Sequence, residues 1–130
     1  MQSAQFIQNV QERAGVDRDE AQRAVEATLT ALSERLTWQE AEHVAAQLPQ
    51  DLQRCMETKS HEKRWSLEQF LHEVASIEGC DDDEARTHAR AVVSTLAEAV
   101  SPGEMQDVLS QLPPAYGELM DTSTNPRPEG

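Results

Sequence analysis

The sequence is poor in the residues from which disulfide scaffolds, phosphate-binding loops and membrane spans are built. It has two cysteines and five glycines in 130 residues. Two cysteines give no disulfide framework, and five glycines leave little room for a glycine-rich phosphate loop. No apolar stretch approaches the roughly 18 residues that a membrane-spanning helix needs. The first residues lack the basic start and apolar block of a signal peptide, so we expect a cytoplasmic protein.

Positive charge is also scarce in this chain. There are 24 Asp and Glu residues against 11 Lys and Arg, which gives a formal net charge of -13. A surface this acidic repels nucleic-acid phosphates and anionic lipid headgroups, so we expect no nucleic-acid or membrane partner. The charge is uneven, because residues 5–56 carry nine acids and five bases whereas residues 65–120 carry eleven and two. A basic partner would experience the stronger field at the second segment.

The most informative feature that is present is an internal repeat. Residues 5–56 align with residues 69–120 at a shift of 64 positions without a gap, and 17 of the 52 pairs are identical. Ordinary composition would give roughly three or four identities. The pattern predicts two pseudo-symmetric helical repeats with a polar connector and a tail. The predicted division is 1–56 for repeat 1, 57–64 for the connector, 65–120 for repeat 2 and 121–130 for a frayed tail.

Apolar residues recur at helical spacing in both repeats, which predicts an all-α bundle of three to four helices per repeat. We expect the longest helices near residues 18–36 and 82–100. They should pack together, because neither repeat has enough apolar surface to be stable alone, and the two repeats should fold as one domain. First helices should end at Gly15 and Gly79, third helices should begin at Trp38 and Pro102, and the first helix of repeat 2 should bury Phe70, Leu71, Val74 and Ile77.

Acidic residues cluster at the expected helix starts, where they are typical of capping boxes. In such a box the cap side chain accepts a hydrogen bond from the third backbone N–H, and a Glu or Gln at that third position reaches back. Negative charge there also favours the positive end of the helix dipole. The pattern predicts five boxes, namely Asp17 with Glu20, Thr37 with Glu40, Ser66 with Gln69, Asp81 with Glu84, and Ser101 with Glu104.

The run Asp81 to Glu84 also permits a metal site, because it holds the densest negative charge of the chain and His88 follows Glu84 by one helical turn. A calcium loop would need a turn glycine and a late bidentate glutamate that this segment lacks. His43 is replaced by Asp107 in the second repeat, so the histidines form no symmetric set. We therefore predict no metal and no cofactor. The candidate ligands of the metal-dependent alternative are Asp81, Asp83, Glu84 and His88.

The sequence offers no convergent catalytic set. Cys55 and Cys80 correspond to Leu119 and Val16 in the other repeat, which indicates packing roles for both thiols. Nucleophilic catalysis would also need a neighbouring base. We therefore predict no catalytic residues.

Trp38 is the candidate for a partner surface. Its counterpart in the second repeat is Pro102 at the first position of an equivalent helix, so the core does not require an indole there. A first-turn position ahead of the buried stripe should point outward, and an exposed tryptophan is a typical partner anchor. The repeated Gln-Leu-Pro at residues 47–49 and 111–113 is interpreted as a corner between helices.

Several of these motifs occur twice in the same register: Gln-Phe in the first helix, Gly-x-Asp-x-Asp-Glu-Ala, an Ala-rich helix, a glutamate after the next cap, and Gln-Leu-Pro. Over about residues 2–120 the chain resembles the bacterial family called domain of unknown function 2267. The resemblance implies a small all-helical protein and carries no established activity, cofactor or catalytic residue. The leading hypothesis is a non-catalytic protein-interaction or stress-related accessory module with a protein partner or as a homodimer.

Overall fold

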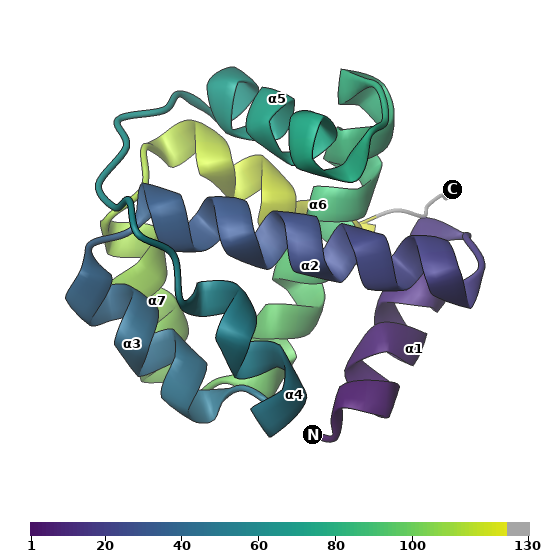
Figure 1. Cartoon of the computed structure of the whole chain (residues 1–130), viewed down its shortest axis with the longest axis horizontal. Coiled ribbons are helices and arrows are strands. Elements are labelled where there is room, and N and C mark those ends of the chain that lie inside the picture. The colour runs from purple at the N-terminus through teal and green to yellow at the C-terminus, as the bar shows by residue number, and fades with distance from the viewer. Residues whose placement is uncertain (125–130) are drawn as a thin grey trace.

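The computed structural model describes residues 1–124, and these form helices without a strand, as the sequence predicts (Figure 1). No described helix is both long enough and apolar enough to cross a bilayer. Part of the tail predicted to fray, residues 121–124, belongs to the last 3-10 helix, and residues 125–130 lie outside the described part. The elements are α1 (Ser3–Ala14), α2 (Arg18–Arg35), α3 (Trp38–Gln47), α4 (Gln50–Gln53), η1 (Arg54–Met56), α5 (Leu67–Glu78), α6 (Asp82–Ala99), α7 (Pro102–Ser110) and η2 (Pro114–Thr124).

The two longest helices, α2 and α6, pack against each other at the centre of the molecule. Each long helix also packs against the shorter helix that precedes the other long helix. Helix α1 packs on α6 as well as on α2, and α5 packs on α2 as well as on α6 (Figure 1). The helices before and after the connector therefore interleave around one core.

Small residues on the long helices let this core close tightly. Ala21, Ala24, Ala85 and Ala89 are fully buried, and short side chains of this kind allow neighbouring backbones to approach. Larger side chains fill the space around them. The largest fully buried ones are Tyr116, Phe6, Phe70, Leu29, Leu36, Leu71, Leu96, Leu119, Val10, Val25, Val44 and Val74.

The connector is a loop, and its end is bonded to the C-terminal turn of α2. The backbone N–H of Glu62 donates to the carbonyl of Leu36 at 2.9 Å, and that of Lys63 donates to Glu34 at 3.0 Å. Glu62 adopts a positive φ of 57° to make this turn. The loop is therefore held against the body of the molecule.

Helices α3 and α7 lie antiparallel, and a glutamine from the end of each helix caps the start of the other. The side-chain oxygen of Gln111 accepts from the backbone N–H of Thr37 at 3.1 Å, and that of Gln47 accepts from Ser101 at 2.6 Å. Each of these glutamines begins a Gln-Leu-Pro motif. The corner predicted from this motif thus has a specific partner in the other half of the chain.

Helix bounds follow the predicted spacing. Helices α5, α6 and α7 begin at Leu67, Asp82 and Pro102, each 64 residues after α1, α2 and α3. Gly15 and Gly79 end the first helices with positive φ of 70° and 80°. The pseudo-symmetric repeat itself stays a prediction.

All five predicted caps are present, but only two of the five boxes are complete. Each cap side chain accepts the N–H of the third residue at 2.8–3.2 Å. The return bond from the third side chain is made by Gln69 and Glu84. At the other three helix starts the glutamates, Glu20, Glu40 and Glu104, face other side chains instead.

The buried stripe of α5 also differs from the prediction at its last turn. Ile77 is 45% exposed. The inward position there is taken by Glu78, whose side chain is 2% exposed because its carboxylate meets His88. A polar contact, and not apolar burial, therefore decides which side chain closes this end of the helix.

We predict that Asp81→Ala lowers the free energy of unfolding by about 1–2 kcal/mol, because the side-chain oxygen that accepts the Glu84 backbone N–H is lost. Asp17→Ala should cost a similar amount. Urea unfolding followed by circular dichroism measures both. Asp83→Ala is the matched control, since this acid in the same turn is not the cap; equal losses for Asp81 and Asp83 would contradict the capping role.

Candidate functional site

Trp38 is the most exposed aromatic side chain among the described residues, with half of its surface accessible. Thr37 caps α3 immediately before it, so the indole occupies the first helical position and points away from the buried stripe. The indole borders a pocket of about 340 Å³. The other lining residues are Glu42, Met56, Glu57, Thr58 and His61.

The far wall of this pocket is fixed by the buried hydroxyl of Ser33 on α2. Ser33 Oγ donates to the carbonyl of Met56 at 2.7 Å and lies 2.9 Å from the hydroxyl of Thr58. The Nδ1 atom of His61 lies 2.9 Å from the carbonyl of Ser33. The hydroxyl and the backbone carbonyl of Ser33 thus hold the two ends of the loop that faces Trp38.

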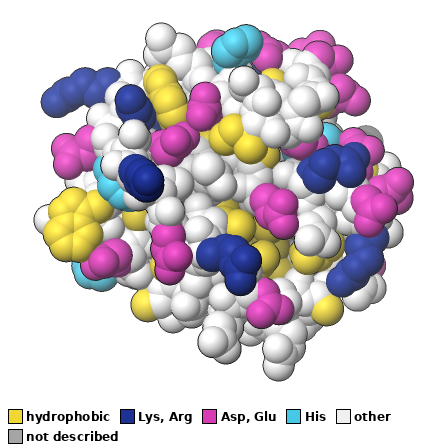
Figure 2. Space-filling view, viewed as in Figure 1, with side chains coloured by type: hydrophobic (Ala, Val, Ile, Leu, Met, Phe, Trp, Pro, Cys, Tyr) yellow, Lys and Arg dark blue, Asp and Glu magenta, His cyan; other side chains and the backbone are white. Residues whose placement is uncertain are grey.

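The pocket is acidic and has an apolar floor. Glu42 and Glu57 are exposed at its rim, whereas Met56 is buried. Figure 2 shows a hydrophobic patch at the edge of the molecule where α3 begins, with acidic side chains beside it. An indole next to carboxylates suits a cationic group, which is attracted both by the face of the ring and by the acids.

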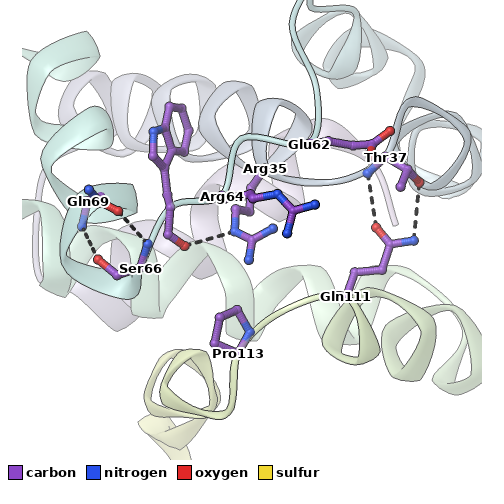
Figure 3. A pocket seen from close by; sticks show the side chains of 9 residues that line it. Arg35, Thr37, Glu62, Arg64, Ser66, Gln69, Gln111 and Pro113 are labelled. Atoms are coloured by element: carbon purple, nitrogen blue, oxygen red, sulfur yellow. Dashed lines mark hydrogen bonds between the residues drawn. The ribbon is translucent and has the colours of Figure 1, made fainter.

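A larger pocket of about 640 Å³ lies on the other side of the same helix start (Figure 3). Arg35 and Arg64 both line it. Much of its lining is already hydrogen-bonded: Arg35 Nε donates to the Trp65 carbonyl at 3.0 Å, and the Gln111 side chain bonds Thr37. These bonds join the first half of the chain to the second, so we interpret this pocket chiefly as a structural junction.

The structure does not bring the four candidate metal ligands of the sequence together. Asp81 and Glu84 bond each other's backbone N–H groups at the start of α6, and Asp83 is exposed in the same turn. His88 is buried and faces two other glutamates. Among residues 1–124, the groups of three ligating side chains with atoms within 4.8 Å are Glu78–Cys80–His88 and Glu40–His43–Glu104.

His88 sits between two carboxylates in the core. Its Nδ1 lies 2.6 Å from Glu78 at the end of α5, and its Nε2 lies 3.0 Å from Glu20 at the start of α2. The contact with Glu78 raises the pKa of His88 above its usual value, although burial opposes the rise. At the 64-residue shift, the residues aligned with His88 and Glu78 are Ala24 and Ala14. Packing alone therefore does not require this polar group.

Neither thiol is poised as a nucleophile. Burial raises the pKa of Cys55 to about 11, and Glu26 adds to the rise. Burial raises the pKa of Cys80 to about 12, and the carboxylates of Glu78, Glu84 and Asp81 add to it. Reactive cysteines need a lowered pKa. Both thiols are protonated near neutral pH.

Sequence inspection missed the glutamates of these groups. The sequence pattern places Glu40 and Glu104 in capping boxes, and the pairing of His43 with Asp107 at the 64-residue shift argues against a symmetric set of histidines. One signal was available: Glu40 and Glu104 are identical at the 64-residue shift. An aspartate can ligate a metal as a histidine does, so the replacement does not break a ligand set.

The family model described as "Uncharacterized conserved protein (DUF2267)" matches residues 3–119. The match confirms the resemblance found in the duplicated motifs. No curated protein shows significant sequence similarity to the chain. The family description names no activity, so function must be inferred from the sites themselves.

We predict that the stability difference between the protein and its His88→Gln variant shrinks as pH rises above about 6.5. A folded-state pKa above the unfolded value stabilises the fold at lower pH, and this contribution is lost as pH rises through the folded pKa. In mild acid the substitution should cost about 3 kcal/mol, because it leaves a buried carboxylate unpaired. Urea unfolding of both proteins at several pH values measures the difference. A difference that grows with pH would contradict the charged pairing.

Proposed function

The chain belongs to the DUF2267 family of uncharacterized conserved proteins, and we propose that it acts as a non-catalytic interaction module. The proposed binding surface is the pocket beside Trp38, and the proposed occupant is a basic, partly apolar segment of a partner protein. The half-exposed indole next to two rim glutamates is the observation that carries this proposal.

Charge favours a basic partner over a second copy of the chain. Each copy carries a net charge of -13, so two copies repel each other over long range. A segment with Arg or Lys side chains gains the attraction of Glu42 and Glu57 and can place its cation on the indole of Trp38. Its apolar side chains can contact the floor at Met56. Attraction of this kind also raises the rate of association.

The protonated thiols and the hydrogen-bonded junction pocket support a binding role over a catalytic one. Cys55 and Cys80 lack the lowered pKa that a nucleophile needs. In the acidic run Asp81 to Glu84, the first and last side chains cap the start of α6. The described structure therefore does not support a metal site formed by this run and His88, because their side chains do not converge.

We predict that Trp38→Ala changes the free energy of unfolding by well under about 1 kcal/mol, because the indole lies largely outside the core. The same substitution should weaken binding of a short peptide in which arginine and leucine alternate by about tenfold or more. With Trp65 replaced by Phe, the emission of Trp38 reports binding directly, and calorimetry compares the variants.

Two substitutions separate the acidic pocket from the junction pocket. Glu42→Gln with Glu57→Gln should weaken the peptide, whereas Arg64→Gln should not, since Arg64 lines the other side of the helix start. A peptide with glutamate in place of arginine should bind more weakly. Binding that survives Trp38→Ala would refute the proposed surface. A concentration-dependent dimer that Trp38→Ala dissociates would replace the basic partner with a second copy.

A further inference from the structure

Two buried glutamates meet where α3 packs on α7. Glu40 and Glu104 are each the third residue after a helix cap, and the exchange of glutamines Gln47 and Gln111 holds their helices antiparallel. Glu40 is 6% exposed and Glu104 is 8% exposed. Neither makes the return bond of a capping box.

The facing carboxylates leave two buried oxygens without a partner. The Oε2 atoms of Glu40 and Glu104 have no hydrogen-bond donor, although both are fully buried. Burial, followed by the effect of Glu104, raises the pKa of Glu40 to about 8, and Asp107 adds to the rise. Two ionised carboxylates this close destabilise each other unless a proton or a cation lies between them.

A histidine completes the arrangement on the solvent side. His43 follows Glu40 by three residues on the same face of α3, and its Nδ1 lies 3.9 Å from Glu40 Oε1. Its side chain is 66% exposed, so the ring can turn and solvent can reach the site. The ligand atoms of Glu40, His43 and Glu104 all lie within 4.8 Å of one another.

We propose that Glu40, His43 and Glu104 bind a divalent transition-metal ion, for which Zn²⁺ is the probe. Imidazole nitrogens and carboxylate oxygens are both zinc ligands, and three protein ligands leave a position for water. Calcium and magnesium fit less well, because they take more oxygen ligands and rarely use imidazole. A glutamate followed three residues later by a histidine also supplies metal ligands in helical bundles. The bound cation would neutralise the repulsion between the two glutamates.

The second group of ligating residues also holds a buried carboxylate oxygen without a hydrogen-bond partner, Oε1 of Glu78, but it already has a basic side chain between its carboxylates. In the group Glu78–Cys80–His88, both imidazole nitrogens already lie within 3.0 Å of a carboxylate oxygen. A protonated His88 therefore balances the glutamates there without an added ion. Between Glu40 and Glu104 no cationic side chain of the described residues plays that part, and His43 approaches Glu40 from the exposed side.

The test is a calorimetric titration of the full-length, EDTA-treated protein with Zn²⁺ near neutral pH. We expect one ion per chain, a rise in melting temperature on binding, and losses of affinity of about 100-fold in Glu40→Gln and Glu104→Gln. His43→Ala should lose about tenfold. The control is His72→Ala, because His72 is an exposed histidine that also contacts a carboxylate, Asp82 at 3.2 Å.

Several outcomes would overturn the metal site. One is the absence of Zn²⁺ binding by the unmodified protein, and another is an equal loss in His72→Ala and His43→Ala, which indicates surface association only. Should the glutamate variants fail to fold, the Zn²⁺ affinity of His43→Ala decides the matter, since His43 is exposed and its substitution should leave the fold intact. An affinity equal to that of the unmodified protein would overturn the site. The result does not depend on peptide binding at Trp38, so either proposal can fail alone.

Discussion

Five of the helices in this protein begin at a Ser, Thr or Asp side chain that accepts the backbone N–H three residues later. This interaction satisfies donors that a helix leaves unpaired at its start, and it fixes where each helix enters the bundle. It also places a glutamate or glutamine at the third position, close to the end of a neighbouring helix. Glu84 and Gln69 turn back to the cap, whereas Glu20, Glu40 and Glu104 face partners from other helices. The direction in which this third side chain points therefore determines which polar groups are buried in the interior.

The direction of the third side chain after each cap depends on which side chains pack against that helix start. At the start of α2, His88 of α6 lies between Glu20 and Glu78, the last residue of α5, and an imidazolium is a stronger partner for Glu20 than its own cap N–H. At α3 and α7 the exchanged glutamines satisfy the cap N–H groups of Thr37 and Ser101. The glutamates Glu40 and Glu104 are thereby released from the return bond. Where a side chain from another helix accepts the backbone N–H of the cap residue, the glutamate of the capping motif is free to make a tertiary contact.

Much of the fold could be predicted from periodicity and helix signals, because caps, left-handed glycines and apolar stripes act within one or two turns. Helix starts at residues 18, 38, 82 and 102 agree with the predicted positions, and the exposure of Trp38 agrees with its exchange for Pro102. The apolar pattern predicts that Ile77 is buried, but it is exposed, because Glu78 takes the inward position and contacts the buried His88 of α6. The contact of Glu40 with Glu104 joins residues 64 positions apart. No pattern within a single helix reveals such a contact.

The interleaving of the first and second halves has a consequence for how the chain could be divided. Its two lysines, Lys59 and Lys63, both lie in the loop that joins the halves. A protease specific for lysine would therefore cut only in this loop and leave two large pieces, with α1 and α2 on one and α5 and α6 on the other. Since α1 packs on α6 and α5 packs on α2, the pieces would share one core and remain a non-covalent complex. In this respect the molecule resembles a heterodimer whose subunits are tethered, and the loop serves mainly to raise the effective concentration of one for the other.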